Sequence, residues 1–268
     1  MKIDIRVSDS NRKTLASASG ADEVTLVYDT AYREGDYLSV ECGEPGNFIF
    51  LLLDDAVLPA FVYLKSAAYR FRIPFGEKRI SYSPRAFTGS RHLLYARKAR
   101  KEEILARKNL ALNPLDTHEN LNLFPHASAN VETRGEAIFA ARNAIDGLKA
   151  NHSHGQWPYT SWGINRDPQA QLKIDFGRKV TVDETVLYLR SDFPHDAWWT
   201  SAVLHFSDGS RLNLKLSKTD KGQHFFFPPR IVDQVTLDTL IKAEDPSPFP
   251  ALTQIEFYGT ETNVNRLR

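Results

Sequence analysis

Residues 188–216 read YLRSDFPHDAWWTSAVLHFSDGSRLNLKL, and this stretch decides the fold class. Apolar and polar residues alternate just before Asp208 and Gly209, and the same alternation returns over residues 211–216. A period of two is typical of a strand with one buried face, and Asp-Gly suits the tight turn of a hairpin. The stretch therefore predicts a β-hairpin.

The remainder of the chain has the same character, because short apolar runs are separated by Gly, Pro, Asn and Asp. Short strands with frequent turn signals favour a sandwich or a barrel over alternating strands and helices. We expect strands at residues 2–7, 23–29, 36–42, 47–53, 60–64, 69–73 and 92–97 in the first half, and at 171–176, 185–190, 202–206, 211–216, 223–227, 234–237 and 253–258 in the second.

Two segments have helical spacing. Residues 101–112 read KEEILARKNLAL, with glutamates in the first turn and Asn-Pro directly after, and residues 136–143 are rich in alanine. A chain of 268 residues is long enough for two domains of ordinary size. We therefore predict an all-β protein with two tandem, jelly-roll-like β-sandwich domains, residues 1–112 and 113–268, joined by a short helical linker.

Composition narrows the class of protein. The chain is 42% hydrophobic and 25% charged with a net charge of +1, as in soluble globular proteins, and no apolar run approaches the ~18 residues of a membrane-spanning helix. The start, MKIDIRV, has no apolar signal core, which favours a cytoplasmic protein, or one that was trimmed or is exported by another route. The single Cys42 excludes an internal disulfide.

Charge is nevertheless uneven along the chain. Residues 65–101 contain eleven Lys or Arg against the single acid Glu77, interleaved with aromatic residues. If Phe71 faces the core, Arg70 and Arg72 share the opposite face, which suits the carboxylates or sulfates of an acidic glycan. A solvated sheet face is an equally good interpretation. Nucleic acid would feel the same charge, although we do not expect it as a partner.

Seven short motifs of the second half follow one another in a familiar order: HASAN at 126–130, ARNAIDG at 141–147, SWG at 161–163, LKIDFG at 172–177, VLYLRSD at 186–192, LHFSDGS at 204–210 and LTQIEFYG at 252–259. Their order resembles the discoidin, or coagulation factor C-type, galactose-binding-like domain, a group that includes bacterial carbohydrate-binding modules. The resemblance covers about half the chain. It implies a jelly-roll sandwich that binds a saccharide through loops at one end.

The resemblance also implies individual roles. The aspartate of the AIDG turn and the glutamate before the terminal aromatic-Gly often lie near a structural calcium ion, and here they are Asp146 and Glu256. Family ligand loops carry an aromatic platform beside Arg, His, Asn or Asp. The insertion NHSHGQWPYTSWG at 151–163 departs from the family pattern, so the shape of the site and a preference for galactose do not carry over.

The loop from Ser191 to Thr200 has no period of its own and contains two adjacent tryptophans. Sugar rings stack on aromatic faces while polar groups bind their hydroxyls. We therefore predict that the ligand-binding residues are Arg190, Asp192, His195, Asp196, Trp198 and Trp199, with help from His152, His154, Trp157 and Tyr159 in the insertion. Neighbours such as Trp198 and Trp199 cannot easily both point inward, so Trp199→Ala and Arg190→Ala should abolish binding without lowering the melting temperature. Trp162 suits a core position better.

Other chemistry has weaker signals. His152 and His154 could share a zinc ion with His195 or Asp196, but a pair of ordinary loop histidines is the better interpretation. No nucleophile elbow, phosphate-binding loop or HExxH motif is present. The sequence thus predicts a non-catalytic saccharide-binding protein of undetermined oligomeric state. The alternatives are a glycan hydrolase or lyase with a site between the domains, and a protein-interaction module.

Overall fold

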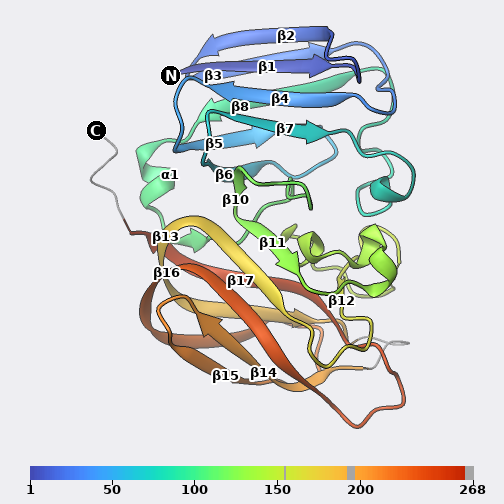
Figure 1. The fold of residues 1–268 in the computed structure, drawn as a ribbon, viewed down its shortest axis with the longest axis vertical. Coiled ribbons are helices and arrows are strands. Elements are labelled where there is room, and N and C mark those ends of the chain that lie inside the picture. Colours follow the sequence, from blue (N-terminus) through green and yellow to red (C-terminus); the bar gives the residue numbers. More distant parts are fainter. Residues whose placement is uncertain (154, 192–196, 263–268) are drawn as a thin grey trace.

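The computed structural model describes residues 1–153, 155–191 and 197–262, and it shows an all-β protein with two stacked sandwiches (Figure 1). The fold class is therefore as predicted. The first half contains β1 (Lys2–Ser8), β2 (Thr14–Ala21), β3 (Glu23–Tyr28), β4 (Tyr37–Cys42), β5 (Asn47–Leu52), β6 (Ala60–Leu64), β7 (Ala68–Arg72) and β8 (His92–Lys98), with the 3₁₀ turn η1 (Gly76–Arg79) between the last two.

These strands form two sheets that face each other. One has the order β2-β1-β4-β7, and the other has the order β10-β6-β5-β8-β3, where β10 (Leu123–Phe124) arrives from later in the chain. Alternate residues of β1, β4 and β7 are buried, so each strand contributes one apolar face to a common core. Strand β2, which the sequence analysis missed, is mostly exposed and made of small residues, so it lacks an apolar period.

The second half is built on long, bent strands. Its main sheet has the order β12-β17-β13-β16-β14-β15, with β11 beside β13 and β9 beside β17. The register of β13 shifts at several positions, which lets one strand turn around the core. The elements are β9 (Lys108–Asn109), β11 (His126–Ala129), β12 (Trp162–Gly163), β13 (Leu172–Leu189), β14 (Trp199–Phe206), β15 (Arg211–Lys215), β16 (Gln223–Lys242) and β17 (Ala251–Glu261).

The predicted hairpin is confirmed. Strands β14 and β15 are antiparallel with Leu204 opposite Leu212, and the turn between them places Gly209 at a φ of 85°, which a residue with a Cβ rarely adopts. The Asp208 carboxylate accepts a hydrogen bond from the Ser210 backbone N–H. Strand β14 begins earlier than predicted, because residues of the tryptophan loop already pair with β16.

The two helical predictions were largely wrong. Helix α1 spans only Lys101–Leu105, because Ala106 is extended and β9 then pairs with β17. Pairing with the second sheet thus overrides the helical spacing of residues 106–112. The alanine-rich segment forms two 3₁₀ turns instead of a helix, η3 (Ala137–Phe139) and η4 (Ala141–Ile145), and a further 3₁₀ turn, η2 (Thr133–Gly135), precedes it.

The chain passes between the two halves more than once. After β9 joins the second sheet, Leu115 and Leu123 return to the core of the first sandwich, and β10 pairs with β6. The segment from Asn113 to Phe124 is therefore packed structure. The domain boundary at residues 112 and 113 stays a prediction.

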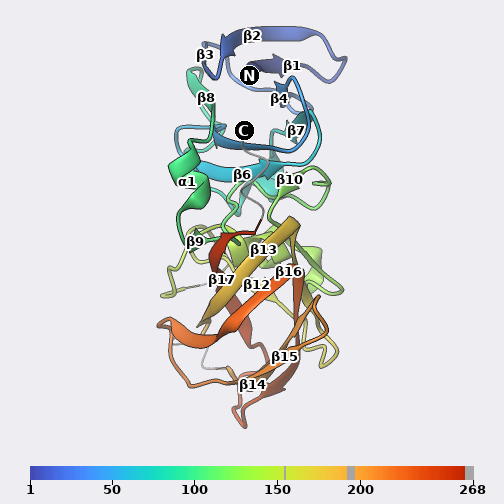
Figure 2. The ribbon, with the colours of Figure 1, turned by 90° about the vertical axis from the view of Figure 1, so that its left-hand side faces the viewer.

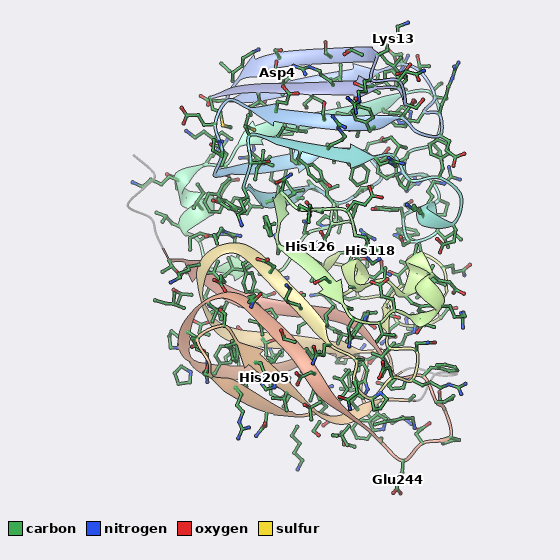
Figure 3. The ribbon with its side chains drawn as sticks, in the orientation of Figure 1. Asp4, Lys13, His118, His126, His205 and Glu244 are labelled. Carbon is green, nitrogen blue, oxygen red and sulfur yellow. The ribbon has the colours of Figure 1, made fainter. Side chains whose placement is uncertain are left out.

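Several side chains join the halves directly. The Arg178 guanidinium of β13 lies over the Phe48 ring at 5.1 Å, and the Lys108 ammonium lies over the Phe61 ring at 4.8 Å. Both aromatic rings belong to β5 or β6. Figure 2 shows β9 and β17 lying directly below the first sandwich, and Figure 3 shows His118 and His126 between the halves. No helix in the described ranges is long and apolar enough to span a membrane.

Candidate functional site

Arg190 follows β13 and holds two chain segments together. Its backbone N–H donates to the Ala251 carbonyl at 2.9 Å, and its Nη1 donates to the Tyr159 carbonyl at 2.6 Å. The side chain is buried, so the guanidinium is fixed under the 151–163 insertion. Sequence analysis predicted that Arg190 and Tyr159 share a site, and the structure brings them together.

A cavity of about 190 Å³ opens beside this arginine at one end of the second sandwich. Its walls come from the 3₁₀ turns, from β12 and the turn after it, and from the start of β17. The lining residues are Thr133, Arg134, Phe139, Ser161, Gly163, Ile164, Asn165, Arg190, Phe249, Pro250 and Ala251. We call this space the end cavity.

The turn after β12 shapes one wall. Asn165 and Arg166 both have positive φ, at 48° and 63°, and the Asp167 N–H donates to the Ile164 carbonyl, as in a type I′ turn. Gly163 lies so close to η2 that a Cβ on it would be 2.6 Å from the Thr133 hydroxyl oxygen. Glycine is therefore required for η2 and β12 to meet at the cavity.

An aromatic ring and a hydroxyl stand out in the lining. Phe249 is 39% exposed, and the Arg166 guanidinium covers its ring at 4.2 Å from the centroid. The Ser161 hydroxyl is buried and makes no hydrogen bond with any described residue. An unsatisfied buried hydroxyl is costly, so a ligand that donates to it or accepts from it gains binding energy.

Arg134 and Glu136 form an ion pair beside the end cavity. Both Arg134 and Glu136 are largely at the surface, and the Arg134 guanidinium donates to both carboxylate oxygens of Glu136. This bond lowers the pKa of Glu136 and keeps both groups ionised. Arg134 also lies over the Phe139 ring at 5.6 Å, so its position at the mouth is fixed from two directions.

The tryptophan predictions divide in two. Trp199 is 1% exposed and belongs to the hydrophobic core, which corrects the expectation that it offers an exposed platform. Trp198 is partly buried and packs against the same core. Trp162 is buried as expected, and its indole N–H donates to the Val131 carbonyl. Trp199, one member of the adjacent pair, is therefore part of the sandwich core.

Of the remaining predicted ligand residues, those that the structure describes do not line the end cavity. His152 is exposed and meets the Tyr159 ring edge-on, with centroids 6.4 Å apart. Trp157 lines a different cavity, between the two halves. Four predicted residues lie outside the described residues: His154, Asp192, His195 and Asp196.

The two predicted calcium ligands already have cationic neighbours from the protein. The Lys149 ammonium lies 2.6 Å from Oε1 of Glu256, and the Arg142 charge acts on Asp146. No group of three His, Cys, Asp or Glu that could hold a metal ion occurs among residues 1–153, 155–191 and 197–262. These side chains do not fit a site for a divalent cation, which needs an excess of oxygen ligands.

The basic segment does not form one face. Arg70 and Arg72 lie exposed on β7, whereas β8 belongs to the opposite sheet. On or beside β8, Arg97 is bound by both oxygens of Glu103, and Arg91 pairs with Asp29. The predicted placement of Arg70 and Arg72 opposite Phe71 is confirmed, but the segment is divided between two sheets, and Arg91 and Arg97 are paired with acids.

Ser161, Asn165 and Phe249 were missed by sequence analysis. Phe249 sits between prolines in the segment PSPFP at 246–250, and a large aromatic residue in such a turn-rich segment is a signal for an exposed platform. Ser161 lies within the SWG motif, in which a serine beside a core tryptophan carries no signal of its own. No pattern in the sequence shows that these residues meet Arg190, because three separate loops bring them together.

Known proteins were compared with the whole chain. No protein-family model and no curated protein matches it. Among solved structures, chitosan-binding module 1 of a chitosanase/glucanase from Paenibacillus sp. IK-5 is 20% identical, covers 57% of this chain and 99% of its own, and has a TM-score of 0.40. The lectin domain of lectinolysin, complexed with Lewis B antigen, is 16% identical over 57% of this chain and 97% of its own, with a TM-score of 0.43.

A third similar structure is the family 32 carbohydrate-binding module of C. perfringens NanJ in complex with galactose. It is 18% identical, covers 49% of this chain and 91% of its own, and has a TM-score of 0.38. All three are carbohydrate-binding modules or lectin domains.

Proposed function

We propose that this protein binds a saccharide in the end cavity and does not catalyse its conversion. The observation that carries the proposal is the buried Ser161 hydroxyl, which makes no hydrogen bond with a described residue and lines the same cavity as Arg190 and Phe249. A pyranose ring offers hydroxyls for such polar groups and a C–H face for the exposed aromatic ring. The described lining residues include no Asp or Glu, whereas most glycoside hydrolases use a pair of these acids.

The dimensions of the cavity favour a short ligand. Its volume of about 190 Å³ is below the ~300 Å³ at which pockets for drug-sized molecules begin. One sugar ring fits such a space, and further rings of an oligosaccharide would extend over the surface. The proposal is therefore recognition of a terminal sugar or of one ring within a chain.

An acidic ligand would need a second contact. Arg70 and Arg72 are the exposed arginines of β7, and the Arg70 guanidinium lies over the Tyr37 ring at 4.5 Å. They belong to the first sandwich, whereas the end cavity belongs to the second. We therefore restrict the acidic-glycan hypothesis to a separate contact of a long polyanion with this arginine pair.

The proposal is tested by a glycan array followed by calorimetric titration of the best glycan. Replacing Phe249 with Ala should weaken binding at least about tenfold, because a stacked ring is lost, while the melting temperature stays within about 2 °C. The matched control is Phe226→Ala, on β16, where the ring is 73% exposed and does not line the cavity. Equal affinity of the two variants, or a chain that binds no glycan on the array, would refute saccharide binding at this site.

The competing classes give different results. A glycan hydrolase or lyase releases product from a polysaccharide panel, and that product should be absent here. A protein-interaction module captures a protein partner and shows no glycan affinity, and Ser161→Ala would leave that capture unchanged.

A further inference from the structure

A second cavity lies between the two halves of the chain, away from the end cavity. Its volume is about 380 Å³, twice that of the end cavity. The first half contributes the loop after β5 and the segment after η1, and the second half contributes residues around η4 and the insertion. The lining residues are Leu52, Asp55, Ala56, Val57, Leu58, Pro59, Ser81, Tyr82, Ser83, Arg85, Pro114, Arg142, Asp146, Leu148 and Trp157.

We call this space the junction cavity, and most of its lining is apolar. Leucine, valine and proline side chains come from the first half, and Leu148 and Trp157 come from the second. Trp157 is only partly buried, so its ring forms part of the wall without being sealed in the core. Leu58 is exposed and lies at the cavity as well. Such walls suit a ligand with an apolar or ring-shaped body.

One buried carboxylate in the lining has an oxygen without a hydrogen-bond partner among the described residues. Asp146 is 3% exposed; its Oδ1 accepts a hydrogen bond from the Leu148 backbone N–H at 2.8 Å, but its Oδ2 accepts none from any described residue. Burial raises the pKa of Asp146 to about 7, against the smaller opposing effects of Arg142, the Leu148 N–H and the nearby Thr160 hydroxyl. Neither Oδ2 nor the Thr160 hydroxyl completes a hydrogen bond with a described residue. A buried acceptor in this state favours a ligand that donates to it.

The neighbouring cation, by contrast, already has several partners. The Arg142 guanidinium donates to the Asp116 and Pro114 carbonyls and to the Asn143 side chain, and it lies over the Tyr82 ring at 4.5 Å. It therefore has little capacity left for an anionic ligand. The lining carries two arginines, Arg85 and Arg142, and two aspartates, Asp55 and Asp146, so it does not favour a cationic ligand either.

We propose that the junction cavity is a second binding site, which takes a neutral, ring-bodied small molecule that donates a hydrogen bond to Asp146. The ring lies against Trp157 and the apolar side chains of the first half. Because both halves supply walls, the ligand bridges them. This site is independent of saccharide binding in the end cavity.

The test uses benzyl alcohol as the probe and benzyl methyl ether as its matched partner without a donor. At pH 8.5, where the Asp146 carboxyl is ionised and can only accept, calorimetric titration or ligand-detected NMR should show benzyl alcohol binding about tenfold more tightly than the ether. Benzoate should bind more weakly than benzyl alcohol. Equal binding of alcohol and ether, or no binding of either, would overturn the proposal.

Variants locate the binding. Leu58→Trp fills the cavity from an exposed position and should abolish probe binding, whereas Leu121→Trp, at an exposed position that does not line the cavity, should leave it unchanged. Should the filled variant fail to fold, Trp157→Ala supplies a second test, because it removes the ring wall and should lower affinity about fivefold or more. Full probe binding by folded Leu58→Trp or by Trp157→Ala would also overturn the proposal. Glycan binding by Leu58→Trp should be normal, which separates this site from the end cavity.

Discussion

Lys149 and Glu256 form an ion pair in which the Lys149 ammonium lies 2.6 Å from the Glu256 carboxylate, on the face shared by β13 and β17. The same ammonium is 3.1 Å from the Tyr188 hydroxyl and lies over the Tyr188 ring. Burial lowers the pKa of Lys149, but its hydrogen bonds to Glu256 and Tyr188 outweigh burial and raise it. A lysine thus supplies the positive charge that the resemblance assigns to calcium.

The first prediction concerns this pair. Calcium at 5 mM, or EDTA, should leave the melting temperature unchanged within about 1 °C, because the carboxylate of Glu256 is already neutralised. Lys149→Met should destabilise the protein by about 1–3 kcal/mol, since it leaves a buried carboxylate without its cation. Both effects are measured by thermal and urea unfolding.

Lys221→Met is the control for that variant. Lys221 is exposed and pairs with Asp220 at 3.5 Å, so its loss should cost less than about 0.5 kcal/mol. A melting temperature that rises by several degrees with calcium would restore the metal site and contradict this interpretation.

The second prediction corrects the role of Trp199. Removing this core ring should cost about 3–5 kcal/mol, so Trp199→Ala is expected to melt far below the wild type. Trp198→Ala removes a partly buried ring and should cost about half as much or less. Denaturant unfolding of the two variants compares them directly. Equal stability of both would argue that Trp199 is not a core residue.

The third prediction is a dependence of stability on pH. Hydrogen bonds from Arg97 lower the pKa of Glu103 from 4.5 to about 2, against the effect of burial. Since the folded pKa is depressed, the bond stabilises the protein above about pH 4.5, and this contribution is lost as the pH falls toward 2. Glu103 is 35% exposed, so solvent screening limits the contribution to about 1 kcal/mol.

Glu103→Gln should therefore lose stability at pH 7 and much less at pH 2.5, in urea unfolding at both values. Glu102→Gln is the control, because Glu102 is the exposed neighbour on the same short helix. If Glu102→Gln showed the same loss, the effect would belong to the charge of α1 and not to the bond with Arg97.

The fourth prediction separates the two proposed glycan contacts. The double variant Arg70→Gln/Arg72→Gln should weaken binding to a uronic-acid polymer and flatten its salt dependence, because two exposed charges are removed. Binding of a neutral glycan in the end cavity should not change. If the double variant binds the polymer as before at every salt concentration, the arginine pair takes no part.

The sequence predicted regular elements well where a period of two met a turn signal, as in the hairpin around Gly209. It failed over residues 106–112, whose helical spacing is real but loses to pairing with β17. It also failed at β2, because alternating Ala and Ser give no contrast in hydropathy. Local patterns describe a segment alone, and these segments are decided by distant partners.

The candidate site was predictable only in part. Arg190 stands at the end of a clear strand, so its place at one end of the sandwich follows from the pattern. Adjacent Trp198 and Trp199 were expected to offer at least one exposed ring, but the sequence does not show which of the two rings is buried in the core. The meeting of Ser161, Asn165 and Phe249 depends on three loops whose paths no periodicity specifies.

The return of residues 115–124 to the first sandwich has a consequence for how the protein unfolds. Because the segment that completes the first core follows β9 of the second sheet, neither half holds its full set of strands until the other has assembled. The halves should therefore melt together in a single calorimetric transition whose van't Hoff enthalpy equals the measured enthalpy. A chain cut after residue 112 would leave the first half with an open strand edge on β6, a template for aggregation.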